Sequence, residues 1–186
     1  MDSRHGSTGL PEGKNRCGAR GRGAQIYGRE CASCHDFGAE HIGQVTPLAE
    51  VATDPERVVS FTPELARAMN TIGEGKPWRF SHFRKTEGYA NMPLDGIWLR
   101  APYLHNGSVP TLRALLFPDE RPAEFYRAYD VYDWQNVGFV SSGPDAEREG
   151  VRFSTHERGN SNAGHLYGTT LDPESRLAVL EYLKGR

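Results

Sequence analysis

Hydrophobic residues are thinly spread along this chain, and they follow helical spacing in only a few short stretches. The clearest of these stretches lies near the C-terminus. There, Leu177, Leu180 and Leu183 recur every three residues and are expected on the inner side of a helix. Asp172 precedes this pattern as an N-cap, and Pro173 occupies the first helical position. The pattern predicts a C-terminal amphipathic helix.

Three shorter helices are indicated by their end signals as much as by their periodicity. Thr62 and Pro63 begin one helix as its N-cap and its first residue. Thr111 caps another, which Pro118 terminates because proline cannot continue a helix. Residues 23–30 form the last, directly before a run of polar and sulfur-containing residues. Every regular element that the sequence predicts is therefore a helix.

The remaining segments show neither the helical nor the two-residue period. Residues 75–90 and 125–140 are aromatic but do not alternate, so we expect irregular chain there, and residues 141–150 form a polar loop. With 186 residues, a hydrophobic content of 37%, Gly 21 and Pro 12, the composition favours one loop-rich domain. We therefore predict an all-α domain over residues 23–186, preceded by a disordered or non-native tail at residues 1–22.

Charge and hydropathy exclude several classes of partner. A formal net charge of −2 gives no strong attraction to nucleic acid or to a membrane surface. No apolar run is long enough to span a bilayer. Residues 1–22 lack the apolar region of a signal peptide, so we expect this chain to be the downstream part of a longer protein. Within that basic, glycine-rich tail, Cys17 is expected to be a solvent-exposed thiol.

The chemistry of the chain is concentrated in Cys31-Ala32-Ser33-Cys34-His35. A C-x-x-C-H run is typical of a c-type haem attachment site. The two thiols add across the haem vinyl groups, and the adjacent imidazole becomes the proximal iron ligand. Ile26 and Tyr27, in the helix just upstream, are expected to cover the ring. One covalent haem c would also supply apolar surface that the protein itself lacks.

Zinc and a redox dithiol are the alternatives for the same motif. Structural zinc normally needs four ligands, often as two pairs, and the chain has no second cysteine pair. A thioredoxin-like dithiol is expected within a βαβ unit, which the pattern does not indicate. Both alternatives are less consistent with the sequence than haem.

Two residues compete for the sixth iron position. Met92, followed by a proline downstream of the motif, has the context in which many small cytochromes present a thioether ligand. His165 follows a segment of small residues, 159–164, which allows the backbone to approach a flat group closely. A third histidine, His41, is expected to be a surface residue of the loop after the motif.

At this point the sequence resembles a known family. The segment "APYLHNGSVPTLRALL" is similar to a segment of the dihaem cytochrome c peroxidase superfamily, and "GNSNAGHLYGTTL" with the closing "EYLKGR" resembles its branch of rubber oxygenases. The resemblance runs from about Gly23 to the end and covers the C-terminal haem half of such proteins. It implies a cytochrome c-like fold, with His165 as the distal ligand and Tyr182 packed across the first helix.

The chain departs from the peroxidase pattern at one ligand. Those proteins take a methionine, or a tyrosine in one relative, from the helix after this motif, and residues 111–122 contain no Met, His or Tyr. Tyr126 is the nearest substitute. The resemblance also implies an optional calcium ion, bound in part by the carbonyl groups of Arg100 and Pro102. His105, within the motif, is either a hydrogen-bonding residue near the haem or a structural histidine.

The resemblance implies an electron-transfer or redox-tuning role as one half of a dihaem oxidoreductase of the oxygenase or peroxidase type. In rubber oxygenases oxygen binds at the other haem, so this iron is expected to be saturated and the chain not catalytic alone. The alternatives are a self-contained mono-haem electron carrier and a peroxidase with an open distal site. The expected partner is an N-terminal haem domain or another redox protein, contacted through exposed aromatic residues. Covalent haem implies a periplasmic or secreted location.

Overall fold

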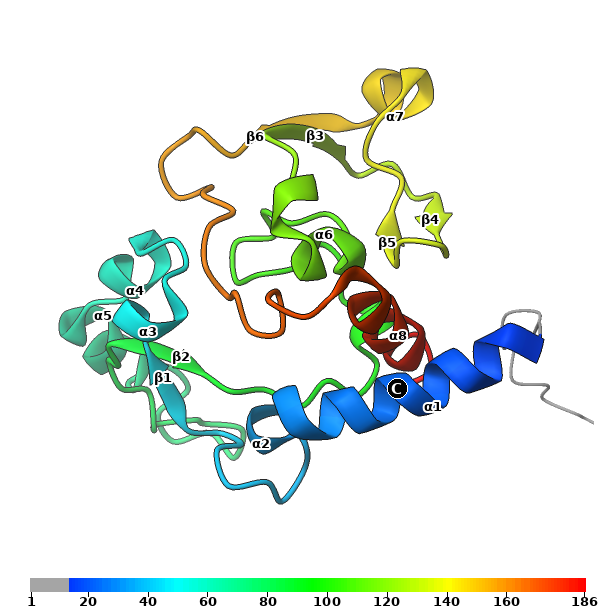
Figure 1. The fold of residues 1–186 in the computed structure, drawn as a ribbon. Helices are drawn as coiled ribbons and strands as arrows, with labels where there is room; N and C mark the ends of the chain where they lie inside the picture. Colours follow the sequence, from blue (N-terminus) through cyan, green and yellow to red (C-terminus); the bar gives the residue numbers. More distant parts are fainter. Residues whose placement is uncertain (1–13) are drawn as a thin grey trace, which may run out of the picture.

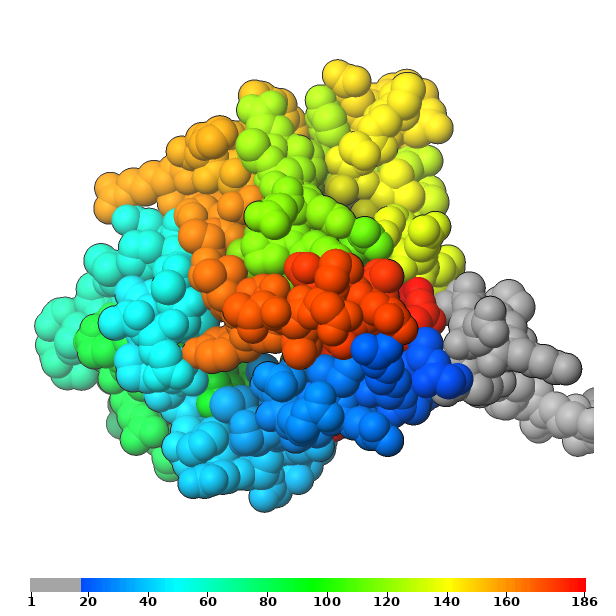
Figure 2. All heavy atoms as spheres, viewed as in Figure 1, coloured from blue at the N-terminus to red at the C-terminus, as the bar shows by residue number. Residues whose placement is uncertain are grey.

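The fold is organised around two crossing helices from the two ends of the chain. The structure, a computed structural model, describes residues 14–186. Helix α1 (Lys14–Glu30) crosses and packs against α8 (Pro173–Leu183), as Figures 1 and 2 show. The rings of Tyr27 and Tyr182 meet there with centroids 5.1 Å apart. The predicted packing of the C-terminal helix on the first helix is therefore confirmed.

The start of α1 differs from the sequence prediction. The helix begins at Lys14, so residues 14–22, which the composition places in a tail, are helical in the structure. Gly23 is buried where this helix meets α8, and Arg22 Nη1 donates a 2.6 Å hydrogen bond to Glu174 of α8. The contacts with α8 explain helix formation that local composition does not favour. Residues 1–13 lie outside the described part, as does the side chain of Cys17.

Gly23 permits the close approach of α1 and α8. A Cβ at this position would lie 1.9 Å from the carbonyl oxygen of Ala178, whereas a Cβ at Gly28 meets nothing within 4 Å. We expect Gly23→Ala to lower the free energy of unfolding by about 1–3 kcal/mol, because the helices must separate. The control Gly28→Ala, on the exposed side, should be neutral or stabilise by up to about 1 kcal/mol. Urea unfolding measures both, and equal effects would contradict this account of the crossing.

The predicted helix starts are confirmed by their capping hydrogen bonds. Thr62, Thr111 and Asp172 each accept a bond from a backbone N–H in the first turn, at 3.1, 3.1 and 2.9 Å. The helices that follow are α5 (Pro63–Met69), α6 (Leu112–Leu116) and α8. On α8, Leu180 and Leu183 are buried, but Leu177 is 39% exposed, so the inner side of this helix is narrower than predicted.

The prediction of an all-α fold is wrong. The described residues form three two-stranded antiparallel sheets beside the helices, so the fold is mixed α and β. The pairs are β1 (Val45–Pro47) with β2 (Gly88–Ala90), β3 (Glu124–Arg127) with β6 (Val151–Ser154), and β4 (Tyr132–Asp133) with β5 (Gly138–Phe139). Each strand has at most four residues, which is too short for alternation to show. The β1–β2 and β3–β6 pairs join segments distant in sequence, whereas β4 and β5 are neighbouring strands.

Other segments predicted as irregular also contain regular elements. The predicted loop 141–150 contains α7 (Pro144–Glu149), and the predicted irregular segment 125–140 contains most of β3 and all of β4 and β5. The remaining elements are short: α2 (Ala32–His35), α3 (Leu48–Val51), α4 (Glu56–Ser60), and the 3-10 helices η1 (Ile97–Leu99) and η2 (Pro118–Glu120). Among the described helices, none is long and apolar enough to cross a bilayer.

Two groups of elements flank the centre of the molecule. The β1–β2 sheet lies with α3, α4 and α5 on one side, and α6 lies with the β3–β6 sheet and α7 on the other (Figure 1). The segment 155–170, orange in the figures, runs between these groups before it reaches α8 (Figure 2). This arrangement brings the segment that contains His165 towards the end of α1 and α2.

Ile26 and Tyr27 do not have the predicted place over a cofactor ring. Both are buried, with 4% and 1% exposure, in the core cluster that includes Leu180 and Leu183 of α8. Neither lines the central cavity, whose lining includes Cys31, Cys34 and His35. These residues stabilise the helix crossing that positions the motif, and other residues form the cavity wall.

Candidate functional site

The Cys31–His35 motif forms one helical turn at the end of α1. The N–H of Cys31 bonds to the carbonyl of Tyr27 at 2.9 Å, and the N–H of His35 bonds to the carbonyl of Cys31 at 3.1 Å. Residues three and four apart on a helix share a face. Cys31, Cys34 and His35 accordingly all line the same central cavity, and both thiols are free. Burial raises the pKa of the Cys31 thiol to about 11.

The cavity has the apolar lining expected for a large flat apolar group. Its volume is about 260 Å³, near the lower end of ligand sites, which start at roughly 300 Å³. Its walls come from α2, α3, β2, α6, α8 and the segment after residue 164. The aliphatic lining residues include Val51, Leu94, Ile97, Leu112, Leu115, Leu116, Val179 and Leu183.

His35 is held by a backbone carbonyl. Its Nδ1 lies 2.7 Å from the carbonyl oxygen of Met92, which can only accept a hydrogen bond. The proton of the neutral ring is therefore on Nδ1, and the lone pair is left on Nε2. This arrangement is the one that orients metal-binding histidines in proteins and fixes their tautomer.

His165 projects into the cavity from a tightly fixed turn. Its φ is +49°, and its N–H donates a 2.7 Å hydrogen bond to the carbonyl of Val51. Gly164, just before it, has a φ of +78°, and a Cβ there would lie 2.4 Å from the backbone of Ala52. Desolvation, together with the nearby His35, lowers the pKa of His165 to about 4. The imidazole is therefore neutral at pH 7.

The centroids of the two imidazoles in the cavity lie at the separation expected for a pair that shares one metal ion. The ring centroids of His35 and His165 are 6.3 Å apart, with the planes inclined by 44°. Two imidazoles that bind one ion from opposite sides, each with a metal–nitrogen distance of about 2.0 Å, have centroids roughly 6 Å apart. Such a pair completes six-coordinate iron around the four nitrogens of a porphyrin. The donor set and the apolar cavity thus fit a haem.

Met92 lies on the His35 side of this arrangement. Its side chain lines the cavity and is 59% exposed, but its carbonyl is bonded to the ring of His35. The residue is therefore next to the proximal imidazole, and His165 is the one that faces that imidazole. In this geometry His165, rather than Met92, occupies the opposite side.

The other sequence-predicted residues lie away from the cavity lining. Tyr126 lies on β3, where its hydroxyl donates to Glu147 at 3.2 Å. His41 lies in the loop between α2 and β1, and His105 stacks on Tyr89 with ring centroids 4.4 Å apart. Tyr89 itself lines the cavity, so His105 is one side chain removed from it. The calcium ion implied for the carbonyl groups of Arg100 and Pro102 stays a prediction.

Sequence reasoning missed two residues that support His165. The ring of Tyr167 packs edge-on against that imidazole at a centroid distance of 5.2 Å, and the Tyr167 hydroxyl donates a 3.1 Å bond to Glu50. Both Tyr167 and Glu50 line the cavity. Tyr167 lies within the segment "GNSNAGHLYGTTL", but nothing in the sequence pairs it with Glu50, because the two are distant in sequence and meet only in the folded chain.

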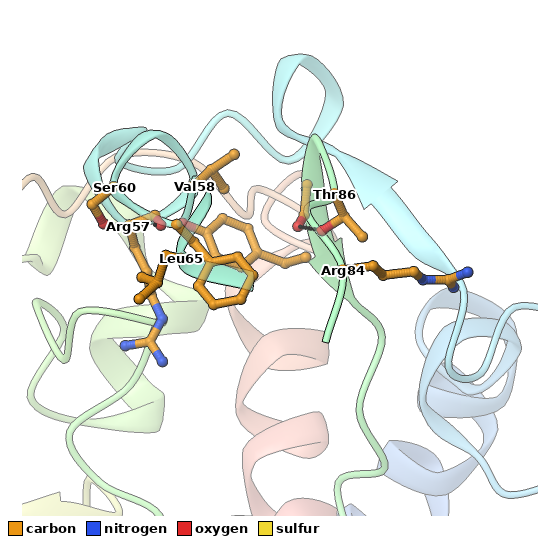
Figure 3. A pocket seen from close by; sticks show the side chains of 9 residues that line it. Arg57, Val58, Ser60, Leu65, Arg84 and Thr86 are labelled. Carbon is orange, nitrogen blue, oxygen red and sulfur yellow. Dashed lines mark hydrogen bonds between the residues drawn. The ribbon is translucent and has the colours of Figure 1, made fainter. Parts of the chain in front are cut away.

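A second cavity of about 400 Å³ adjoins the first behind Tyr89. Figure 3 shows it between α4, α5 and β2, with Arg57 and Arg84 on opposite sides of apolar side chains such as Val58 and Leu65. It lacks the cysteines and the facing imidazoles of the first cavity. Among the described side chains, no group of three or more His, Cys, Asp or Glu gathers that could hold a metal ion by itself.

Comparisons with known proteins support the cytochrome interpretation over part of the chain. Residues 88–127 match the family model described as RoxA-like, cytochrome c-like. This match supports a c-type cytochrome domain, which implies haem c. The matched segment contains Met92 and His105 but not the cysteine motif or His165, so the roles of those residues rest on the geometry above.

Two curated relatives are uncharacterised proteins of Sinorhizobium fredii (strain NBRC 101917 / NGR234). The protein y4iJ is 42% identical over 106 residues, which cover 52% of this chain and 17% of the relative. The protein y4iM is 56% identical over 54 residues, which cover 29% of this chain and 12% of the relative. The aligned parts thus span less than a fifth of either relative's length.

Proposed function

We propose that this chain is a c-type cytochrome domain that holds one covalent haem between His35 and His165 and transfers electrons within a larger oxidoreductase. The observation that carries this proposal is the 6.3 Å separation of the two imidazole centroids across an apolar cavity. The thiols of Cys31 and Cys34 line the same cavity beside His35. The groups that would attach haem, ligate its iron and shield it from water thus line one cavity.

Each residue has a defined task in this proposal. Cys31 and Cys34 would each add a thiol S–H across a vinyl group, forming a C–S bond without net oxidation. His35 would use Nε2 as an iron ligand, since Nδ1–H is bonded to the carbonyl of Met92. Bound haem supplies reversible exchange of one electron between ferric and ferrous iron. The leucine side chains of α6 and α8 that line the cavity would exclude water from it.

A filled distal side favours electron transfer over catalysis at this iron. If His165 is the sixth ligand, no position is left for oxygen or peroxide. The alternative of a self-contained carrier with Met92 as ligand is less consistent with the geometry, because Met92 lies beside His35. The peroxidase alternative would require His165 to leave a position that two backbone constraints fix.

Association with another haem domain is supported by exposed aromatic side chains. Trp78, Phe80 and Trp134 are 65%, 57% and 48% exposed, and large apolar side chains at a surface often mark an interface. The curated relatives are several times longer than the matched segments, so a larger parent protein has room for such a domain. Because haem c is attached outside the cytoplasm, we propose a periplasmic or secreted location.

The test uses the chain produced with a periplasmic haem-attachment system. We expect one haem per chain by the pyridine haemochrome assay, a low-spin ferric spectrum and reversible one-electron reduction. Carbon monoxide should not bind the ferrous form, and hydrogen peroxide should not be turned over. Stoichiometric binding of carbon monoxide, or sustained peroxide turnover, would establish an open site and contradict the proposal.

A further inference from the structure

Arg121 joins the segment that contains His165 to helix α6. It follows η2, and its guanidinium group donates hydrogen bonds to backbone carbonyl oxygens of the His165 segment and of α6. One nitrogen, Nη1, bonds to Asn162 at 2.5 Å and to Gly164 at 2.9 Å. On the other side, Nη2 bonds to Leu115 at 3.1 Å and Nε to Ala114 at 3.3 Å. Arg121 is also partly buried.

We propose that Arg121 is the positioning residue that holds His165 in place as the distal haem ligand. The Gly164 carbonyl belongs to the peptide bond that joins Gly164 to His165, so the guanidinium fixes the backbone directly before the ligand. Helix α6 contributes Leu112, Leu115 and Leu116 to the cavity wall. One rigid planar group therefore holds the ligand and the apolar wall in fixed positions relative to each other. This inference rests on the function proposed above.

The opposite side of the same turn is held without Arg121. The N–H of His165 bonds to Val51 of α3, and Gly164 packs directly on the backbone of Ala52. Loss of Arg121 therefore frees only the α6 side and should leave the turn attached to α3. The expected defect is a loosened ligand within a folded domain.

The charge of Arg121 has a second consequence. All four of its hydrogen-bond partners are neutral carbonyl groups, and within the described residues it forms no ion pair with a carboxylate. Its guanidinium is bonded to the Gly164 carbonyl, so its positive charge lies beside the residue that precedes His165. A nearby cation favours ferrous over ferric iron, because reduction removes one positive charge from the site. Arg121 should therefore raise the haem reduction potential.

Arg121→Gln and Arg121→Lys separate these two effects, and Arg176→Gln is the matched control. Arg176 binds the carbonyl of Leu116 at 3.3 Å and stacks on Phe117, so it contacts the same part of α6 but not the His165 segment. We expect Arg121→Gln to show a high-spin ferric fraction, at least tenfold faster binding of carbon monoxide and a lower potential. Arg121→Lys should keep the potential but still bind carbon monoxide faster. Arg176→Gln should resemble the wild type.

The inference is overturned if Arg121→Gln matches Arg176→Gln in spin state, carbon monoxide binding and potential. If Arg121→Gln does not fold, Arg121→Lys decides through its carbon monoxide binding, and a rate equal to that of the wild type overturns the inference. Failure of the proposed function is distinguishable, because the wild type itself would then lack the low-spin spectrum, whereas failure of this inference alone leaves the wild-type spectrum intact.

Discussion

Replacing Cys31 and Cys34 together with alanine is expected to abolish covalent haem. The wild-type chain should keep its haem through denaturing electrophoresis, as peroxidase-active staining of the band shows, and the double variant should lose it completely. The physical reason is that the two thiols are the attachment atoms in a helical turn that faces the cavity. Non-covalent contacts do not survive denaturation, whereas thioether bonds do.

The single variants and a control make this result specific. Either single variant, Cys31→Ala or Cys34→Ala, should keep one thioether bond and show a shifted pyridine haemochrome band. Ser33 is exposed and lies between the two cysteines in sequence, so the Ser33→Ala variant should retain haem as the wild type does. Covalent haem in the double variant would contradict the assignment of the motif.

Replacing His165 with alanine is expected to change the spin state of the iron. The ferric spectrum should convert from low-spin to high-spin, and the ferrous form should bind carbon monoxide stoichiometrically. Both changes follow from an empty sixth position opposite His35, since the two imidazoles face each other at 6.3 Å. Absorption spectra and carbon monoxide titration of the purified variant measure the effect.

Met92→Ala is the matched control for this result. The substitution removes the thioether but keeps the backbone carbonyl that accepts the bond from His35. The variant should therefore stay low-spin, with an unchanged affinity for carbon monoxide. A near-infrared methionine–iron band in the wild type that disappears in Met92→Ala would show instead that Met92 holds the iron.

Elements defined by neighbouring residues could be predicted from the sequence. Cys31, Cys34 and His35 lie within one helical turn, so their spacing is enough to bring them to one face. The caps at Thr62 and Asp172 likewise depend on a side chain and an N–H three residues later. Such features form wherever the local chain is helical, whatever the rest of the fold does.

The tertiary structure alone decided the fold class and brought His165 into the same cavity as His35. The short strands form because partners such as Thr46 and Tyr89 meet from distant parts of the chain, and strands of this length have no visible period. The sequence left His165 and Met92 as competing ligands. Their places differ because Val51 and Arg121 fix the turn before His165, while Met92 is bonded to the proximal imidazole. These are long-range contacts, which spacing along the chain does not encode.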